Sequence, residues 1–313
     1  MEFRYLVSFL AIAEELHFGR AAARLHLAQP SLSQQLQRLE REVGVELVSR
    51  TSHEVRLTPA GEAFRKEAER LVGQAARAVE AAKAAAQGRS GTVSVGFNFP
   101  AGLSVLPPTL ARLAADHPKV QAQLWERRSG PQVEALLNDE LDVGFVYGRP
   151  RTAQLESREL LSLPVVAVVA PRHPWARRES ISMLELGERP CVLFRRGQSP
   201  AMHDAIVHAA ARAGTELVVA EEVDDPLATA VVVAARPLLG FASAARAVRA
   251  GSQGLVAVAL TGPVPRLNLY AAWRAGDTSP VLEAFLASLA ASGPFTWREP
   301  DPEPGPDRLS PAS

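Results

Sequence analysis

The sequence predicts an α+β protein with a helical N-terminal segment, one long helix, and a C-terminal region of alternating strands and helices. Three observations predict this class. Residues 18–43 contain two short helical patterns that meet across a sharp break. After Pro59, no proline interrupts a strongly helical composition as far as Ala86. Beyond residue 91, extended apolar runs alternate with helical segments, which is typical of α/β sheets.

The second helical pattern within residues 18–43 is amphipathic. Its apolar side carries Leu32, Leu36, Leu39 and Val43, and Pro30 suits a first helical turn. Its polar side carries hydroxyls, amides and arginines at Ser31, Ser33, Gln34, Gln37, Arg38 and Arg41. Two tightly joined helices, the second polar on one side, predict a helix-turn-helix that reads DNA bases in the major groove. An ordinary helical hairpin with a solvated face is the alternative.

The flanking segments predict a winged helix. Residues 2–16 are expected to form a supporting helix, with apolar side chains at Phe3, Leu6, Phe9, Leu10 and Ala13. Gly44 is expected to end the second helix as a C-cap glycine. Residues 45–57 contain two short extended runs around residues 51–54, which we interpret as the wing, with His53 and Glu54 at its tip.

A long helix is predicted to begin at Thr58 and Pro59, a hydroxyl N-cap followed by proline at the first helical position. Its apolar residues are spaced by four and three, as in a heptad seam: Phe64, Ala68, Leu71, Ala75, Ala78, Ala82 and Ala85. A narrow, alanine-rich seam on such a long helix is expected to pack against a second copy. An intramolecular strut is the alternative.

Residues 91–297 are predicted to form two lobes with parallel sheets, and the chain is expected to cross between them near residues 163 and 263. The expected strands are 92–97, 120–127, 141–147, 165–170, 190–194, 216–220, 238–242, 256–260 and 267–273. The expected helices are 102–116, 131–139, 201–213, 226–235 and 279–291. Residues 298–313 are rich in proline and acidic residues and are expected to be disordered.

Composition limits the compartment. Cys191 is the only cysteine in 313 residues, so no intramolecular disulfide can form. We see neither a signal peptide nor an apolar run long enough to span a bilayer, and we therefore expect a cytoplasmic protein. The net charge is zero, and seven arginines balance seven glutamates over residues 1–58. A basic DNA-binding surface would therefore require arginines that face DNA and glutamates that point away.

Ligands of open α/β sheets bind beyond the carboxyl ends of strands, where helix N-termini expose N–H groups. Three loops fit this position: residues 98–102, 127–131 and 194–202. Their arginines, hydroxyls and helix N-termini favour a small anionic ligand such as an organic acid. For each single arginine, a solvated surface charge is the alternative.

Several motifs stand at fixed spacing from the first residues onward: Phe9-Leu-Ala-Ile-Ala-Glu-Glu15, Phe18-Gly-Arg-Ala-Ala22, Ala28-Gln-Pro-Ser-Leu-Ser-Gln-Gln35, Leu39-Glu-Arg-Glu-Val-Gly44 and Val55-Arg-Leu-Thr-Pro-Ala-Gly61. Together they closely resemble the DNA-binding domain of LysR-type transcriptional regulators, and a weaker likeness continues to about Trp297. The resemblance implies a winged helix-turn-helix over residues 1–58, a linker helix and hinge over 59–90, and a periplasmic-binding-protein-like effector domain over 91–297. Lobe I would be 91–163 with 264–297, and lobe II 164–263.

The resemblance also implies site residues and partners. DNA contacts are expected at Arg20, Gln29, Pro30, Ser31, Ser33, Gln34, Arg38, Arg50 and Arg56. Effector contacts are expected at Asn98, Phe99, Pro100, Ala101, Ser129, Tyr147, Arg195, Ser199 and Met202. The expected partners are double-stranded DNA, a small-molecule effector, a second copy through the linker helix, a tetramer built from such dimers, and RNA polymerase. No cofactor, metal or membrane is implied.

The chain departs from the family pattern at three places: Pro100 where relatives often have serine, Tyr147 where some have arginine, and Arg236-Pro237 in a loop that is usually glycine-rich. An enzyme is not expected, because no GxSxG, P-loop or CxxC motif is present, and His203 and His208 do not share a helix face. A transport-type solute-binding protein would leave residues 1–86 unexplained. A binding module that has lost DNA binding is the more serious alternative.

Overall fold

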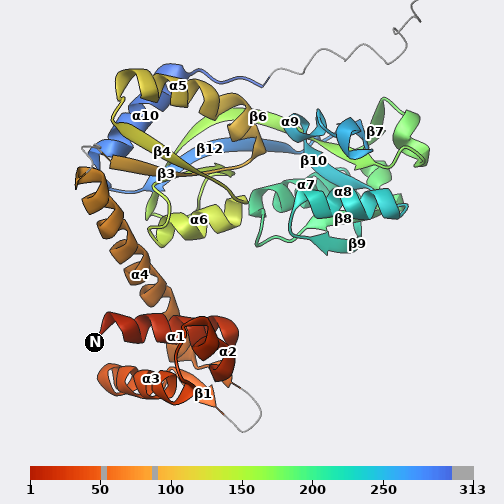
Figure 1. Ribbon diagram of the computed structural model, residues 1–313. Coiled ribbons are helices and arrows are strands. Elements are labelled where there is room, and N and C mark those ends of the chain that lie inside the picture. Colours follow the sequence, from red (N-terminus) through yellow and green to blue (C-terminus); the bar gives the residue numbers. More distant parts are fainter. Residues whose placement is uncertain (51–54, 87–90, 298–313) are drawn as a thin grey trace, which may run out of the picture. The chain divides into compact units, whose positions relative to one another are not determined.

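A computed structural model describes residues 1–50, 55–86 and 91–297 of the protein (Figure 1). The expectations for the wing tip at His53 and Glu54, the hinge at 87–90 and the tail at 298–313 lie outside these residues. The chain forms two compact units. The N-terminal unit comprises residues 1–91 with 137–140, and the C-terminal unit comprises the remaining residues.

The N-terminal unit contains the predicted helix-turn-helix and the two strands of the wing. Its helices are α1 (Phe3–Glu15), α2 (Phe18–Arg24), α3 (Gln29–Val43) and α4 (Pro59–Ala86). Strand β1 (Val48–Arg50) pairs antiparallel with β2 (Val55–Leu57). Gly44 ends α3 in the left-handed conformation, with φ of 83°, which confirms its role as a C-cap.

The core of the N-terminal unit follows the predicted apolar stripes, except at their ends. Leu32, Leu36 and Leu39 of α3 are buried against the apolar face of α1. Phe3 and Val43 were expected to join this core, but they are 48% and 36% exposed. Each lies at a terminal residue of its helix, beyond the reach of the neighbouring helix, so these two expectations were wrong.

Helix α4 is attached to the wing at its first turn. The Thr58 hydroxyl accepts a hydrogen bond from the Gly61 N–H at 2.9 Å and donates one to the Glu46 carbonyl at 2.7 Å. The predicted N-cap is therefore confirmed, and it also fixes the start of α4 to the base of the wing.

The predicted seam of α4 is divided between two environments. Phe64 packs edge-to-face on Phe9 with ring centroids 5.4 Å apart, and Ala68 is fully buried in the same core. Leu71, in contrast, is 44% exposed. The first two seam positions therefore pack within the chain, contrary to the expectation of one continuous intermolecular seam. The side chains of Ala82 and Ala85 lie outside the described part of the chain.

The C-terminal unit contains one mixed sheet and one small parallel sheet. The mixed sheet has the strand order β4-β3-β5-β12-β6-β11-β7, and β10 also pairs with β6. Its strands are β3 (Gly91–Phe97), β4 (Val120–Glu126), β5 (Val143–Tyr147), β6 (Leu155–Val169), β7 (Ser180–Ser182), β10 (Gly240–Ser243), β11 (Val256–Thr261) and β12 (Arg266–Arg274). In the small sheet, β8 (Pro190–Phe194) pairs with β9 (Val218–Val223).

The expectation of purely parallel sheets was wrong. Strands β3 and β5, β7 and β11, and β8 and β9 are parallel. Strand β12 is antiparallel to β5 and β6, and β10 and β11 are antiparallel to β6. The antiparallel pairs all involve β6 or β12, the two strands that run from one lobe toward the other.

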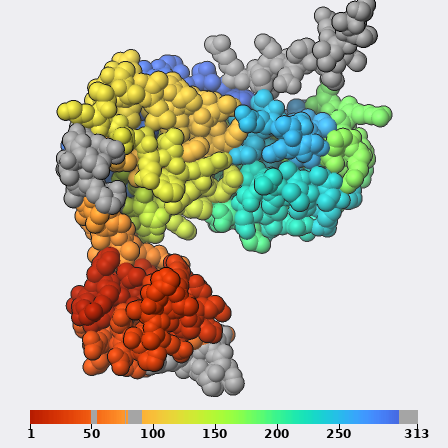
Figure 2. Space-filling view, viewed as in Figure 1, coloured from red at the N-terminus to blue at the C-terminus, as the bar shows by residue number. Residues whose placement is uncertain are grey.

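Strand β6 is shared by both lobes, which lie side by side within this unit (Figure 2). It pairs with β12 as far as Pro164 and with β10 from Val165 onward. The sequence predicted only its second part, because Glu156, Arg158 and Glu159 interrupt the apolar pattern of the first part.

The helices of the C-terminal unit are α5 (Leu106–Asp116), α6 (Ser129–Leu137), α7 (Pro200–Arg212), α8 (Pro226–Ala235), α9 (Ala244–Ala247) and α10 (Pro280–Ser292). In lobe I, α5 and α10 cover one face of the sheet and α6 lies on the other (Figure 1). A π-helical turn over Ala101–Val105 precedes α5, where one continuous helix was expected. Pro107 and Pro108 cannot donate backbone hydrogen bonds to the preceding turn, which accounts for the wider turn there.

The close contact between α4 and the wing predicts opposite effects at two glycines of the same helix. A Cβ atom at Gly61 would lie 2.0 Å from the Leu47 carbonyl oxygen. We expect Gly61→Ala to destabilise the protein by about 1–3 kcal/mol. At Gly73 the nearest atom would be 3.6 Å away, so Gly73→Ala should stabilise by about 0.5–1 kcal/mol through helix propensity. Urea unfolding of both variants measures this difference, and equal midpoints would contradict it.

Candidate functional site

One exposed face of α3 carries the side chains expected to read DNA. Gln29, Pro30, Ser31, Gln34 and Arg38 are exposed, and Ser33 is half-buried. The apolar face of the same helix is buried, so the helix is fixed with these groups directed outward. Hydroxyls and amides at successive turns match the donors and acceptors of base edges.

The charges around this face are more strongly paired than expected. Arg20 donates from Nε to Glu15 Oε2 at 3.2 Å, so Glu15 does not point away from it as the sequence analysis required. Arg38 Nη1 donates to the Tyr5 hydroxyl at 3.3 Å, and that hydroxyl donates to Glu2 at 2.7 Å. Exposed ion pairs of this kind are worth little and exchange readily for a phosphate.

The remaining two predicted DNA contacts lie in the wing strands. Arg56 is exposed on β2. Arg50 is the last residue of β1, and its side chain lies outside the described part of the chain.

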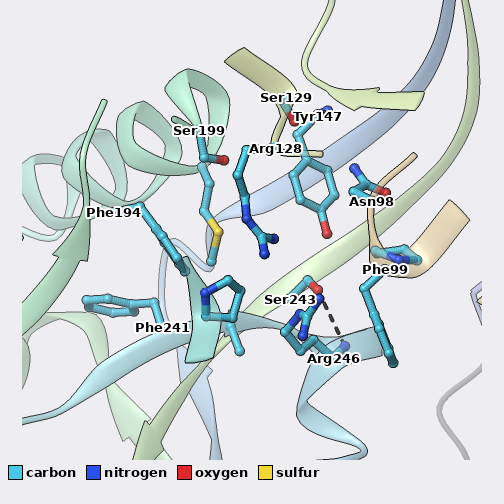
Figure 3. A pocket seen from close by; sticks show the side chains of 14 residues that line it. Asn98, Phe99, Arg128, Ser129, Tyr147, Phe194, Ser199, Phe241, Ser243 and Arg246 are labelled. Carbon is cyan, nitrogen blue, oxygen red and sulfur yellow. Dashed lines mark hydrogen bonds between the residues drawn. The ribbon is translucent and has the colours of Figure 1, made fainter. Parts of the chain in front are cut away.

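A pocket lies within the C-terminal unit, between residues of lobe I and residues of lobe II (Figure 3), and the empty space in and in front of it, including open solvent, is about 450 Å³. Polar groups and apolar walls both line it. The lining residues are Asn98, Phe99, Pro100, Arg128, Ser129, Tyr147, Phe194, Ser199, Met202, Pro226, Phe241, Ala242, Ser243 and Arg246.

The structure brings seven of the nine predicted effector residues into this pocket: Asn98, Phe99, Pro100, Ser129, Tyr147, Ser199 and Met202. Ala101 is fully buried beside it, and its N–H donates to Asn98 Oδ1 at 3.3 Å rather than toward a ligand. Arg195 is exposed and pairs with Asp224 at 3.0 Å, outside the pocket. Arg195 therefore does not line the pocket, contrary to the expected effector contact.

Two arginines that were not predicted line the pocket. Arg128 precedes α6, and Arg246 belongs to the short helix α9. Arg128 lies inside the loop 127–131 that the sequence analysis selected, but two adjacent arginines gave no sign of which one faces inward. Arg246 follows Ser243 in a segment without a sequence signal, and only the fold brings it to the pocket.

Arg128 is half-buried, and its guanidinium has no hydrogen-bond or ion-pair partner among the described residues. Figure 3 shows its side chain extending into the pocket between Ser199 and Tyr147. Burial, and then the positive charge of Arg246, hold the pKa of Arg128 below its usual value. An arginine remains protonated at neutral pH even so. Glu126 and Asp225 attract this charge without forming an ion pair with it.

The hydroxyl groups of the pocket are neutral donors and acceptors. Burial raises the pKa of Tyr147 to about 12, although a hydrogen bond with Ser243 acts in the opposite direction. Ser129 Oγ accepts from the Tyr147 N–H at 3.0 Å, which leaves its own proton free to be donated. Ser199 is 5% exposed, and its side chain does not cap α7.

A second, small pocket adjoins the first and shares Pro226, Phe241, Ala242 and Arg246 with it. Small and apolar side chains form most of its remaining wall, including Ala230, Ala247 and Ala250. This side of the pocket therefore offers an apolar surface.

Other kinds of site are not found in the described part of the chain. No group of three metal-ligating side chains occurs in the described ranges. Cys191 is buried, and burial raises the pKa of its thiol to about 11, so the thiolate is scarce at neutral pH. None of the helices among the described residues has the length and apolar character needed to cross a bilayer.

Family models match both the N-terminal and the C-terminal part of the chain. Residues 3–62 match the family described as bacterial regulatory helix-turn-helix protein, lysR family, and residues 86–293 match the LysR substrate binding domain. The first match covers the helix-turn-helix and the wing strands, and the second covers the unit that contains the pocket. The chain belongs to the LysR family of DNA-binding transcriptional regulators.

Individual relatives are similar over two thirds of the chain or more. The HTH-type transcriptional regulator IlvR of Caulobacter vibrioides is 33% identical over 298 residues, covering 94% of this chain and 99% of the relative. AlsR of Bacillus subtilis is 36% identical over 214 residues, covering 68% of this chain and 71% of the relative.

Among solved structures, the LysR family regulator CbnR is similar with a TM-score of 0.72 and 27% identity, covering 93% of this chain and 99% of that chain. Full-length CbnR complexed with its target DNA gives a TM-score of 0.70 at 28% identity, covering 94% of this chain and 100% of that chain. These similarities confirm the resemblance found in the sequence.

Proposed function

We propose that this regulator binds a specific operator through α3 and that a small anionic effector in the pocket changes its activity on DNA. The observation that carries the effector assignment is the half-buried Arg128 guanidinium without a partner. An unpaired buried charge is costly, and a carboxylate bound beside it would relieve that cost. Ser129 and Ser199 line the same pocket, and their hydroxyls would donate to the same anion.

The apolar wall supports an organic acid rather than an inorganic anion. Phe194 and Phe241 lie on the side of the pocket away from Ser129 and Tyr147 (Figure 3), and Met202 also lines the pocket. Burying the apolar body of an acid there contributes roughly 25 cal/mol per Å². We therefore propose a carboxylate with an apolar body, and the protein would act with its DNA in the cytoplasm.

The exposed apolar side chains of α4 support assembly. Leu71 and Val79 are 44% and 53% exposed, Ala78 is exposed, and Ala75 is half-buried. We propose that this face packs against α4 of a second copy, and that the resulting dimer addresses two half-sites on one face of the duplex. We also propose that two such dimers assemble into a tetramer and that the DNA-bound protein contacts RNA polymerase.

The first test concerns base reading. Ser33→Ala and Gln34→Ala should each weaken binding to a selected operator by about 1–3 kcal/mol and relax sequence preference. Arg38→Ala should weaken binding to all DNA alike and reduce the salt dependence, because it removes a phosphate contact. Fluorescence anisotropy over a salt series measures both effects. Arg112→Ala in the C-terminal unit is the control with the same charge change, and unchanged operator binding by both α3 variants would refute the assignment.

The second test concerns assembly. In a fragment of residues 1–90, replacing Ala75 and Ala78 with glutamate would bring like charges together at close helix contacts and should convert a dimer to a monomer. Ala76→Glu adds the same type of charge on a neighbouring face and should leave the dimer intact. Sedimentation at tens of micromolar distinguishes these results, and a monomeric unmodified fragment would show that α4 does not carry the dimer.

The third test concerns the effector. In a thermal-shift screen of aromatic and aliphatic acids, a ligand at about 100 times its dissociation constant should stabilise the protein by about 2.7 kcal/mol. Arg128→Gln should abolish that shift, whereas Arg195→Gln should preserve it, because Arg195 lies outside the pocket. The effector would be neutral, or bound elsewhere, if no acid stabilised the protein or if Arg128→Gln responded like the wild type.

A further inference from the structure

The two arginines of the pocket belong to opposite lobes. Arg128 stands at the N-terminal end of α6 in lobe I, and Arg246 lies on α9 in lobe II. They are the two lining residues with a permanent charge, and both charges are positive. After burial, the positive charge of Arg246 is the largest cause that lowers the pKa of Arg128, because the two like charges repel.

Arg246 already has partners, and both come from lobe I. Its guanidinium carbon lies 4.5 Å from the ring centroid of Phe99, and its Nη2 lies 3.4 Å from Glu126 Oε1. The Glu126 side chain is 53% exposed, and 3.4 Å is long for a charged hydrogen bond. Solvent screening makes this ion pair weak, and a ligand could replace it at low cost.

The lobes also meet at the backbone beside Arg128. The Gly130 N–H donates to the Gln198 carbonyl at 3.1 Å, and a Cβ atom at residue 130 would lie 1.9 Å from the Gly197 carbonyl oxygen. Only glycine permits this approach. A fixed contact at one side of the pocket means that a small rotation of the lobes changes the separation of the two arginines on the other side.

We propose that the anionic ligand closes the lobes by bridging Arg128 and Arg246, and that Glu126 is an internal counter-ion which the ligand displaces from Arg246. The inference rests on the proposed anion site and adds its regulation. Without ligand, the repulsion between Arg128 and Arg246 opposes closure, and the weak contacts of Arg246 with Glu126 and Phe99 favour it. With ligand, a carboxylate between the two arginines attracts both of them. The extent of closure then depends on how much more tightly the anion binds the closed arrangement of the lobes than the open one.

Binding measurements test the bridge. Benzoate and succinate serve as probes, with calorimetric titration of the full-length protein. Arg246→Gln should weaken binding of a probe by at least about tenfold, since it removes a charged hydrogen bond. Glu126→Gln should strengthen binding by up to about fivefold, because Arg246 loses its competing partner. Arg195→Gln and Glu134→Gln, which change the same charges outside the pocket, should bind like the wild type.

Distance measurements test closure separately. Fluorescent labels at Lys119→Cys in lobe I and Arg212→Cys in lobe II would report the lobe separation, and the native thiol of Cys191 is buried. A bound probe should bring the lobes together and so raise the efficiency of energy transfer between the two labels in the wild type, but not in Arg246→Gln. Without any ligand, Arg128→Gln should raise it as well, because the repulsion is gone. Gly130→Ala should lower it, since the added methyl group separates the lobes.

The outcomes separate this inference from the proposed function. If an acid binds the wild type, Arg246→Gln and Glu126→Gln with equal affinity, the anion site stands and the bridge is wrong. If Arg128→Gln leaves the ligand-free lobe separation unchanged, repulsion does not hold the lobes apart and the proposal is overturned. If neither probe binds the wild type, the anion site fails and the bridge fails with it.

Discussion

Strand β6 is the constraint on which the ligand-binding unit depends. One continuous strand supplies hydrogen bonds to β12 in lobe I and to β10 and β11 in lobe II. A break in this strand would disrupt the backbone hydrogen bonds of both lobes. The two lobes are therefore joined by a shared strand and not by a flexible linker. The pocket forms beside this strand, where β5, β8 and β10 end and the chain turns toward helices.

The sequence was most informative for the N-terminal unit, because local signals decide its structure. Helical spacing located Leu32, Leu36 and Leu39, and the glycine and threonine signals located both helix ends. The failures at Phe3 and Val43 arose because periodicity gives the buried face of a helix but not how far along the helix its neighbour extends. The heptad pattern assigned Ala68 to a contact with a second copy, but Ala68 is buried in the core of the N-terminal unit.

The pocket was predicted less completely, because its charges come from positions that only the fold brings together. Loops after strands indicated Ser129, Ser199 and Asn98, and all three line the pocket. The choice of arginine failed: Arg195 finds an acidic partner on the surface, while Arg128 faces inward without one. Neither burial nor partner can be read from residue type, so a chain rich in arginine offers many candidates and no way to rank them.

The hydrogen bonds of Thr58 have a mechanical consequence. They tie the first turn of α4 to the base of the wing, and Gly61 lets the helix lie directly against the Leu47 carbonyl. A helix of 28 residues extends about 42 Å at about 1.5 Å per residue. Because its first turn is fixed to the wing, a rotation of this helix about its own axis would turn the helix-turn-helix with it.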